Sequence, residues 1–212
     1  MQQIFRKKKL ILILIVLLGS SAPLSAQLYK LDRSALVELS EDRKPEPTEF
    51  WQFISNSTNY TSLGVPAALL IGGLATHNPQ MKLNALHITE TLLVSSAMTF
   101  ATKYAVHRSR PAATNTDILA ASNAGSPSMP SGHTSEAFAT ATSLSLAYPK
   151  WYVIVPAYAW AGSVGYSRMY LGVHYPTDVA AGAFLGITSA YLTRKANIWL
   201  QHRHERRALM VP

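Results

Sequence analysis

Five apolar segments, separated by proline, glycine and charged residues, fill the chain from about residue 62 onward. They cover residues 63–76, 83–106, 132–148, 151–166 and 177–195. None of them alternates apolar and polar residues as a half-buried strand does, and their alanine, leucine and glycine content is typical of closely packed helices. The sequence therefore predicts an all-α fold, a compact helical bundle of about five to six helices.

Length and charge narrow the class of protein further. The 212 residues are enough for one domain with a core of its own, and the absence of cysteine excludes disulfides, a cysteine nucleophile and zinc–thiolate sites. The net charge of +8 is concentrated near the two ends of the chain, and the rest sums to about zero. A continuous basic face for nucleic acid is therefore not expected.

The two ends of the chain carry signals of their own. Residues 1–26 combine a basic start through Lys9, an apolar run from Leu10 to Leu18, and small residues up to Ala26. This pattern predicts an export signal cleaved after Ala26 or, alternatively, a retained N-terminal membrane anchor. We expect residues 27–60 to form a polar arm with a short helix near residues 50–54, residues 61–196 the helical domain, and residues 197–212 a basic C-terminal tail.

The sequence leaves open whether the helical segments span a membrane. Several have only about 15 apolar residues, fewer than the roughly 20 of a span, and the mean hydropathy of the chain is only +0.09. A spanning topology is nevertheless self-consistent, because it places the basic tail after Thr193 on the inner side, as the positive-inside rule requires. On balance we expect association with a membrane, with oligomeric state undetermined.

Two polar clusters lie at the borders of these segments. In the first, Lys103 and Arg110 are seven residues apart, so two helical turns would place both cations on one side, and Pro111 would end that helix. Two such cations alone would more commonly compensate the helix dipole. In the second, Ser131 and Gly132 open a helix with exposed N–H groups that suit an anion, and His133 follows in the first turn.

A third cluster contains Ser167 and Arg168, then His174, then Asp178. An imidazole attacks through one ring nitrogen when the other holds its proton toward a fixed acceptor, and Asp178 is placed to accept it. Taken alone, a histidine next to an aspartate is usually an ordinary hydrogen bond. Together, however, the three clusters offer three cations, a helix N-terminus and two histidines, which suits a phosphoryl group without a metal.

The three clusters resemble the three-part signature of the type-2 phosphatidic acid phosphatase family. The matching motifs are Lys103-x6-Arg110-Pro111, Pro130-Ser131-Gly132-His133 and Ser167-Arg168-x5-His174-x3-Asp178. The superfamily also contains soluble bacterial acid phosphatases and vanadium haloperoxidases. The resemblance covers roughly residues 60–195, so residues 61–196 would be the phosphatase domain, with an acid phosphatase/vanadium haloperoxidase-like fold.

The resemblance implies a role for each motif residue. His174 would attack phosphorus and form a phosphohistidine, oriented by Asp178, while His133 would protonate the leaving oxygen and then deprotonate water. The residues implied to hold the phosphate oxygens are Lys103, Arg110, Ser131, Gly132 and Arg168. No metal and no cofactor is implied.

The function that this resemblance implies is a phosphatase of the cell envelope, in the inner membrane with its site facing the periplasm, or in the periplasm itself. Its substrates would be phosphate monoesters or diphosphates linked to lipids, such as phosphatidate, polyprenyl diphosphate or a lipid A phosphate. Two alternatives remain, a soluble periplasmic acid phosphatase with small substrates and a vanadate-dependent haloperoxidase.

Some polar residues outside these motif positions need separate interpretation. We interpret His107 and Arg108 as rim residues that match no fixed position of the family. Glu90 is expected to hydrogen-bond within the bundle or to face a polar rim, and Glu136 to be a helix-start carboxylate rather than a catalytic acid. Residues 112–129 are long enough to form a flap over the site.

Overall fold

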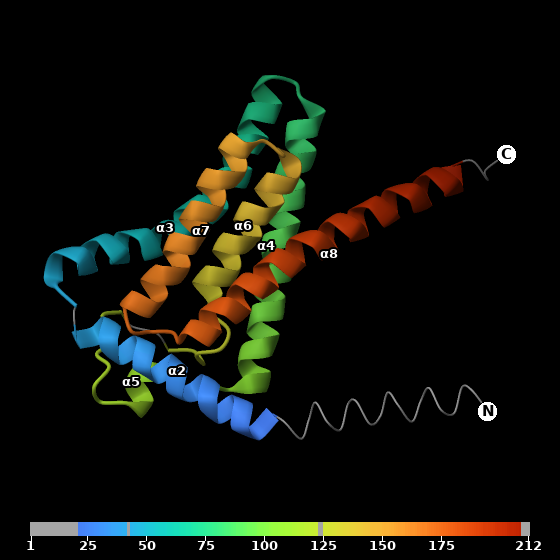
Figure 1. Ribbon diagram of the computed structural model, residues 1–212. Coiled ribbons are helices and arrows are strands. Elements are labelled where there is room, and N and C mark those ends of the chain that lie inside the picture. Colours follow the sequence, from blue (N-terminus) through green and yellow to red (C-terminus); the bar gives the residue numbers. More distant parts are fainter. Residues whose placement is uncertain (1–20, 42, 123–124, 209–212) are drawn as a thin grey trace, which may run out of the picture.

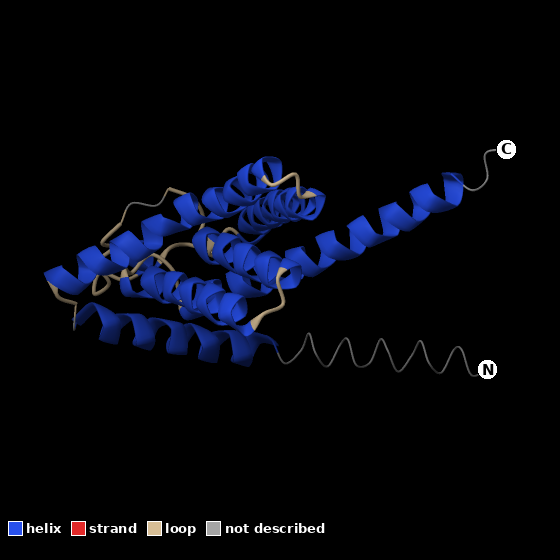
Figure 2. Cartoon of the chain, turned by 90° about the horizontal axis from the view of Figure 1, so that it is seen from above, coloured by secondary structure: helices blue, strands red, loops and turns tan. Residues whose placement is uncertain are grey.

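The structure is a computed structural model that describes residues 21–41, 43–122 and 125–208. Six long helices and one short one make up this part of the chain, with no strand in the described ranges (Figure 2). They are α2 (Ser21–Glu41), α3 (Pro45–Ala75), α4 (Pro79–Val106), the four-residue α5 (Pro111–Thr114), α6 (Gly132–Ala147), α7 (Trp151–Tyr170) and α8 (Pro176–Ala208). The predicted all-α fold is confirmed.

Helix α6 lies at the centre of the bundle. It packs against α3, α4, α7 and α8, and α3 packs in turn on α4 and α7. Helix α2 crosses one end of the bundle, where it contacts α7 and α8, and α8 continues well past the other helices toward the C-terminus (Figure 1).

Local sequence signals explain where several helices begin and end. Proline occupies the first turn of α3 and α4 and opens α5 and α8, where its missing N–H costs no helical hydrogen bond. The Asn78 side chain caps α4 by accepting from the N–H groups of Gln80 and Met81, at 3.0 and 3.2 Å. That helix ends where His107 adopts a left-handed conformation, with φ of 50°.

The expected polar arm differs from the structure. Residues 27–60 form most of α2 and the first half of α3, so the short helix expected near residues 50–54 is part of one 31-residue helix. The reason is that Ser55, Thr58 and Ser62 are buried along a continuous packing face that sequence polarity alone did not reveal. The expected borders at residues 60 and 196 both fall within helices, α3 and α8.

The expected export signal lies mostly outside the described residues. Residues 1–20, which contain the basic start and the apolar run, are not described, and the expected cleavage point after Ala26 falls within α2.

Small residues line the contacts between the helices. Gly182 and Gly186 of α8 lie directly against α6, where an added Cβ would come within 2.6 Å of the Ser131 carbonyl and 2.3 Å of the Ser135 carbonyl. Across α4 and α6, the hydroxyl of Ser95 lies 2.7 Å from that of Ser135. Close approach of helices through glycine and hydroxyl residues explains why the core holds so few large side chains.

Large apolar side chains are instead exposed along α3, α4, α7 and α8. Examples are Ile71, Leu93, Val155 and Phe184. No helix among the described residues is both long enough and apolar enough to cross a membrane.

Candidate active site

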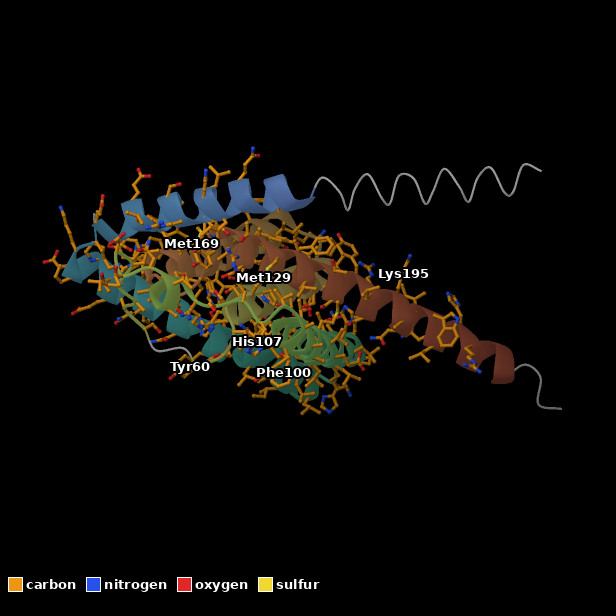
Figure 3. All side chains as sticks on the ribbon, turned by 90° about the horizontal axis from the view of Figure 1, so that it is seen from below. Tyr60, Phe100, His107, Met129, Met169 and Lys195 are labelled. Carbon is orange, nitrogen blue, oxygen red and sulfur yellow. The ribbon has the colours of Figure 1, made fainter. Side chains whose placement is uncertain are left out.

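Three segments distant in sequence converge at the end of the bundle that α2 crosses. They are the loop after α4, the start of α6, and the turn between α7 and α8 (Figure 1). Figure 3 shows this end from below, with Met129 of the loop before α6 and Met169 near the end of α7 labelled. All the residues implied by the sequence motifs lie in these segments or in the helical turns next to them.

The two cations of the first cluster are arranged differently from the expectation. Lys103 is buried in the last turn of α4, and its Nζ donates a 2.5 Å hydrogen bond to the Pro127 carbonyl. Helix α4 ends before Arg110, so the two cations do not share a helix, and Pro111 begins α5 instead of ending α4. The left-handed turn at His107 redirects the chain, a conformation that residue spacing did not predict.

Arg110 connects the first cluster to the third. Its NH1 donates to the Val173 carbonyl at 2.8 Å and lies 3.3 Å from Nε2 of His174. Its Nε donates to the Ser126 carbonyl at 2.7 Å. Main-chain carbonyls therefore hold the guanidinium beside the imidazole before any substrate binds.

The start of α6 has the expected form. Ser131 is the N-cap residue, and its N–H donates to the Asp178 carbonyl at 3.0 Å, which ties the second cluster to the third. The Ser131 hydroxyl accepts from the Thr134 hydroxyl at 2.9 Å. Gly132 faces open space, because an added Cβ would meet no atom within 4 Å, and His133 follows in the first turn. The N–H groups of this turn are therefore accessible to an anion.

The turn between α7 and α8 positions Arg168 and His174. The Arg168 carbonyl accepts from the N–H groups of Val173 and His174, at 3.2 and 3.3 Å. The Arg168 guanidinium is buried, and its NH1 donates to the Ser55 hydroxyl at 2.5 Å while its Nε has no partner among the described residues. At least the Nε–H donor of this cation therefore remains for a ligand.

Asp178 lies behind His174 in the first turn of α8. Its Oδ2 is 3.6 Å from Nδ1 of His174, which is longer than a hydrogen bond. The same oxygen accepts from the Ser128 hydroxyl and, at 2.9 Å, from the Tyr175 N–H. Burial opposes ionisation of this carboxyl, but its neighbours His174, Ser128 and Arg108 lower its pKa below the usual value.

Arg108 is not a rim residue, contrary to the expectation. Its NH1 donates to Asp178 at 2.7 Å and its NH2 to Asp32 at 2.8 Å, while the guanidinium lies 4.0 Å from the ring centre of Tyr175. Its proximity to Arg110 in sequence was a signal that could have revealed this role. His107, by comparison, is exposed.

Asp32 and Ser128 are site residues that the sequence did not reveal. Asp32 is buried in α2 and also accepts from the Thr177 N–H at 3.0 Å, so α2 is bonded to the start of α8. It lies far from the motifs in sequence, within the presumed arm, and no spacing pattern marks it. Ser128 lies in the segment that was expected to be a flap.

The electrostatics of the site favour neutral histidines surrounded by positive charge. Burial, followed by the charges of Arg168, Arg110 and Lys103, lowers the pKa of His133 to about 4. Burial is also the main reason that the pKa of His174 falls to about 3, and Arg110 and Arg168 contribute. Burial and neighbouring cations lower the pKa of Lys103 to about 8. Cations that lower one another's pKa repel one another, and a bound anion would relieve this repulsion.

The fold and the site define a class, an all-helical phosphatase, and comparison with known proteins gives the family. The profile of the PAP2 superfamily matches residues 84–201, more than half of the chain. The chain therefore belongs to the PAP2 superfamily. The predicted family resemblance is confirmed.

Three known proteins illustrate the similarity. An undecaprenyl-diphosphatase of Sulfolobus acidocaldarius is 44% identical over 66 residues, which is 31% of this chain and 32% of that protein. The chain thus spans between a quarter and a third of the length of the curated relatives it matches. The crystal structure of Aquifex aeolicus LpxE has a TM-score of 0.63 at 26% identity and covers 76% of this chain and 92% of that one.

The third is the crystal structure of a transmembrane PAP2 type phosphatidylglycerolphosphate phosphatase from Bacillus subtilis. It has a TM-score of 0.68 and covers 89% of this chain and 94% of that one. Because the sequence identity is only 24%, this similarity concerns the fold alone.

Proposed function

We propose that this PAP2-family phosphatase acts in the cell envelope on lipid-linked phosphate monoesters or diphosphates, through a phosphohistidine on His174. The single observation that carries the proposal is the contact between the first and third clusters. Arg110 lies 3.3 Å from Nε2 of His174, and the charges of Lys103, Arg110 and Arg168 all act on His133. Two histidines and three cations thus surround one place where phosphorus could sit.

The phosphate would be bound by donors that are already in position. The cations are Lys103, Arg110 and Arg168, and the Ser131 hydroxyl and the Gly132 N–H complete the phosphate seat. Because main-chain carbonyls hold Lys103 and Arg110 in advance, little reorganisation is needed when charge develops on the phosphoryl oxygens. These three cations supply the charge compensation that a divalent metal supplies in other phosphatases, so we expect activity to persist in millimolar EDTA.

In the first step, Nε2 of His174 attacks phosphorus. At neutral pH the imidazole is neutral, because its pKa is about 3, so the lone pair is available. The Asp178 carboxylate, 3.6 Å from Nδ1, stabilises the positive charge that develops on the imidazole ring. As the bond from phosphorus to the leaving oxygen breaks, the proton of His133 passes to that oxygen. A bound phosphate dianion raises the pKa of His133 from about 4 and so allows it to carry this proton.

In the second step, water replaces the imidazole. His133, now neutral, takes a proton from water while the water oxygen bonds to phosphorus and the bond to Nε2 breaks. Inorganic phosphate leaves and both histidines return to their starting states. One imidazole has a carboxylate behind it and the other has none, which supports this division of roles.

A lipid substrate is supported by the outer surface of the protein. Phe100 and Tyr104 of α4 lie within one helical turn of Lys103 and are 63% and 53% exposed. Further large apolar residues are exposed along α3, α7 and α8. Such a surface suits contact with acyl or prenyl chains and with a membrane. The undecaprenyl-diphosphatase relative is consistent with a lipid-linked substrate.

Fractionation and a substrate panel test this proposal together. We expect activity in washed membranes, release only with detergent, and higher kcat/KM for phosphatidate, polyprenyl diphosphate or lipid A phosphates than for small esters. Activity in the detergent-free soluble fraction with small esters preferred would favour a periplasmic acid phosphatase. Halide oxidation with added vanadate and peroxide would favour a haloperoxidase.

A further inference from the structure

A cleft of about 270 Å³ lies between α4 and α6, next to the proposed phosphate seat. Lys103, Gly132 and His133 border it on the side of the seat, and Glu136 borders it one helical turn farther along α6. Since His133 would protonate the leaving oxygen, the cleft is where the leaving group would lie. Its lining therefore bears on which phosphate esters the enzyme accepts.

Most polar groups of the cleft are already bonded to the protein. The Thr99 hydroxyl donates to that of Ser135 at 2.8 Å, and Ser135 is also paired with Ser95. Lys103 donates to the Pro127 carbonyl. The three hydroxyls hold α4 against α6, and Lys103 is bonded to the loop before α6.

Glu136 differs from these groups. Its carboxylate has no hydrogen-bond or ion-pair partner among the described residues, although the side chain is half-buried. Burial raises its pKa, which means that removal from water has penalised its charged form without compensation. A donor on a ligand would supply the missing partner, whereas a second negative charge would be repelled.

The apolar side of the cleft is formed by two aromatic rings. Phe100 and Tyr104 lie with their ring centres 4.5 Å apart, and both border the cleft. A carboxylate opposite aromatic rings suits a leaving group that has hydroxyl or ammonium donors on one side and carbon atoms on the other.

We propose that Glu136 is a specificity-determining residue that selects leaving groups bearing hydroxyl or ammonium donors, such as a polyol or amino sugar, and disfavours diphosphates. This inference rests on the proposed function and refines it, because it ranks the lipid phosphates that the phosphate seat alone treats alike. In a diphosphate the leaving group is itself a phosphate, and its charge would lie beside the Glu136 carboxylate.

The test compares Glu136→Gln with wild type on three probes: glucosamine 1-phosphate, farnesyl phosphate and farnesyl diphosphate. Glutamine keeps the shape and removes the charge. We expect kcat/KM for glucosamine 1-phosphate to fall roughly tenfold, the usual effect of losing a hydrogen bond to a charged group. The value for farnesyl diphosphate should rise severalfold, and that for farnesyl phosphate should stay within about twofold.

A matched control uses a second half-buried carboxylate of the same bundle. Glu90 lies on α4 thirteen residues before Lys103, about 20 Å away along the helix. Glu90→Gln should leave all three kcat/KM values in their wild-type ratio. Thermal unfolding of both variants distinguishes a loss of specificity from a loss of folded protein.

The outcomes separate this inference from the proposed function. If wild type hydrolyses the probes, His174→Ala abolishes the activity, and Glu136→Gln leaves the three-way ratio unchanged, the role of Glu136 is wrong and the phosphatase mechanism stands. A parallel fall on all three probes would also overturn it, because Glu136 would then act in general catalysis or folding. If His174→Ala retains activity on the probes, both proposals fail.

Discussion

The two ends of the bundle formed by α4, α6 and α8 each hold a histidine, an arginine and a carboxylate, yet they differ in charge balance. At the end away from α2, Asn197 donates to Glu90 at 2.6 Å and lies 3.3 Å from Nδ1 of His87. Burial is the main reason that the pKa of His87 is lowered; the charge of Glu90 raises this pKa and that of Arg194 lowers it, so the two charges oppose each other. The prediction that Glu90 hydrogen-bonds within the bundle is confirmed.

At the other end, positive charge is in excess. Asp178 is already bonded to Arg108 and Ser128, so it does not pair with Lys103, Arg110 or Arg168. No salt bridge to these three cations exists among the described residues. Uncompensated cations around neutral histidines, rather than the residue types themselves, therefore distinguish the proposed phosphate site from the polar cluster at the opposite end.

The largest expected effect is on turnover, and it should differ between His174 at one end of the bundle and His87 at the other. His174→Ala should abolish turnover of p-nitrophenyl phosphate, because no other group would be left to form the bond to phosphorus. His87→Ala, the control at the opposite end, should keep activity within about threefold of wild type, since it touches no substrate. Steady-state kinetics on folded protein, checked by circular dichroism, decides between them. Near wild-type activity of His174→Ala would remove the proposed mechanism.

A smaller effect separates the two carboxylates. Asp178→Asn should lower kcat by about three orders of magnitude, because the amide can no longer orient and stabilise the imidazolium, as in the aspartate of a serine-protease triad. Glu90→Gln should change kcat by less than about twofold. If Asp178→Asn matched wild type in kcat, Asp178 would serve only to cap the start of α8.

Helix α2 contributes to the site through Asp32, which accepts a hydrogen bond from Arg108 in the loop after α4. Asp32→Asn weakens the bond that aligns Arg108 on Asp178, so we expect kcat to fall roughly tenfold with KM little changed, in line with the loss of a charged hydrogen bond. A structural role alone would lower the melting temperature and leave the kcat of the folded fraction intact. Measuring both quantities on the same preparation tells these apart.

The pH dependence of stability provides a fourth prediction. His174 has a pKa of about 3 in the folded protein, below the value near 6.5 of an unfolded histidine. The unfolded state therefore binds more protons between these values, and stability is complete above pH 6.5 and falls as the pH drops toward 3.

The site histidine should therefore steepen the loss of the free energy of unfolding, by up to about 1.4 kcal/mol per pH unit. His174→Asn should show a shallower decrease than wild type in denaturant titrations between pH 7 and 4.5. His77→Asn, at an exposed position in the turn between α3 and α4, should keep the wild-type slope. Equal slopes in all three proteins would contradict the depressed pKa of His174.

Much of the fold was predictable because the helical segments of this chain are bounded by local signals. The predicted segment 132–148 matches α6 (Gly132–Ala147) closely, since Ser131 and Gly132 begin the helix and Tyr148 follows its end. The second half of α3 was predicted as the segment 63–76, but α2 and the long first half of α3 were not. In α3 the buried face includes Ser55, Thr58 and Ser62, small polar residues that resemble exposed ones in sequence. Burial of serine and threonine depends on partners that only the tertiary structure supplies.

The site shows the same division. The motif residues could be named from the family resemblance of the three clusters, and the structure brings them to one end of the bundle. The supporting residues could not, because Asp32 and Ser55 reach Arg108 and Arg168 from helices that share no motif with them. The prediction that Lys103 and Arg110 share one helix was also wrong, because α4 ends at the left-handed residue His107 before the expected second turn.

Trapping the phosphorylated enzyme tests the central claim most directly. With phosphorus-labelled p-nitrophenyl phosphate, whose leaving group needs no acid, His133→Ala should accumulate label because the water-activating base is missing. After an alkaline quench and digestion, we expect an acid-labile label on the peptide that contains His174, and none in His174→Ala. Label on another residue, or sustained turnover by His174→Ala, would contradict the account.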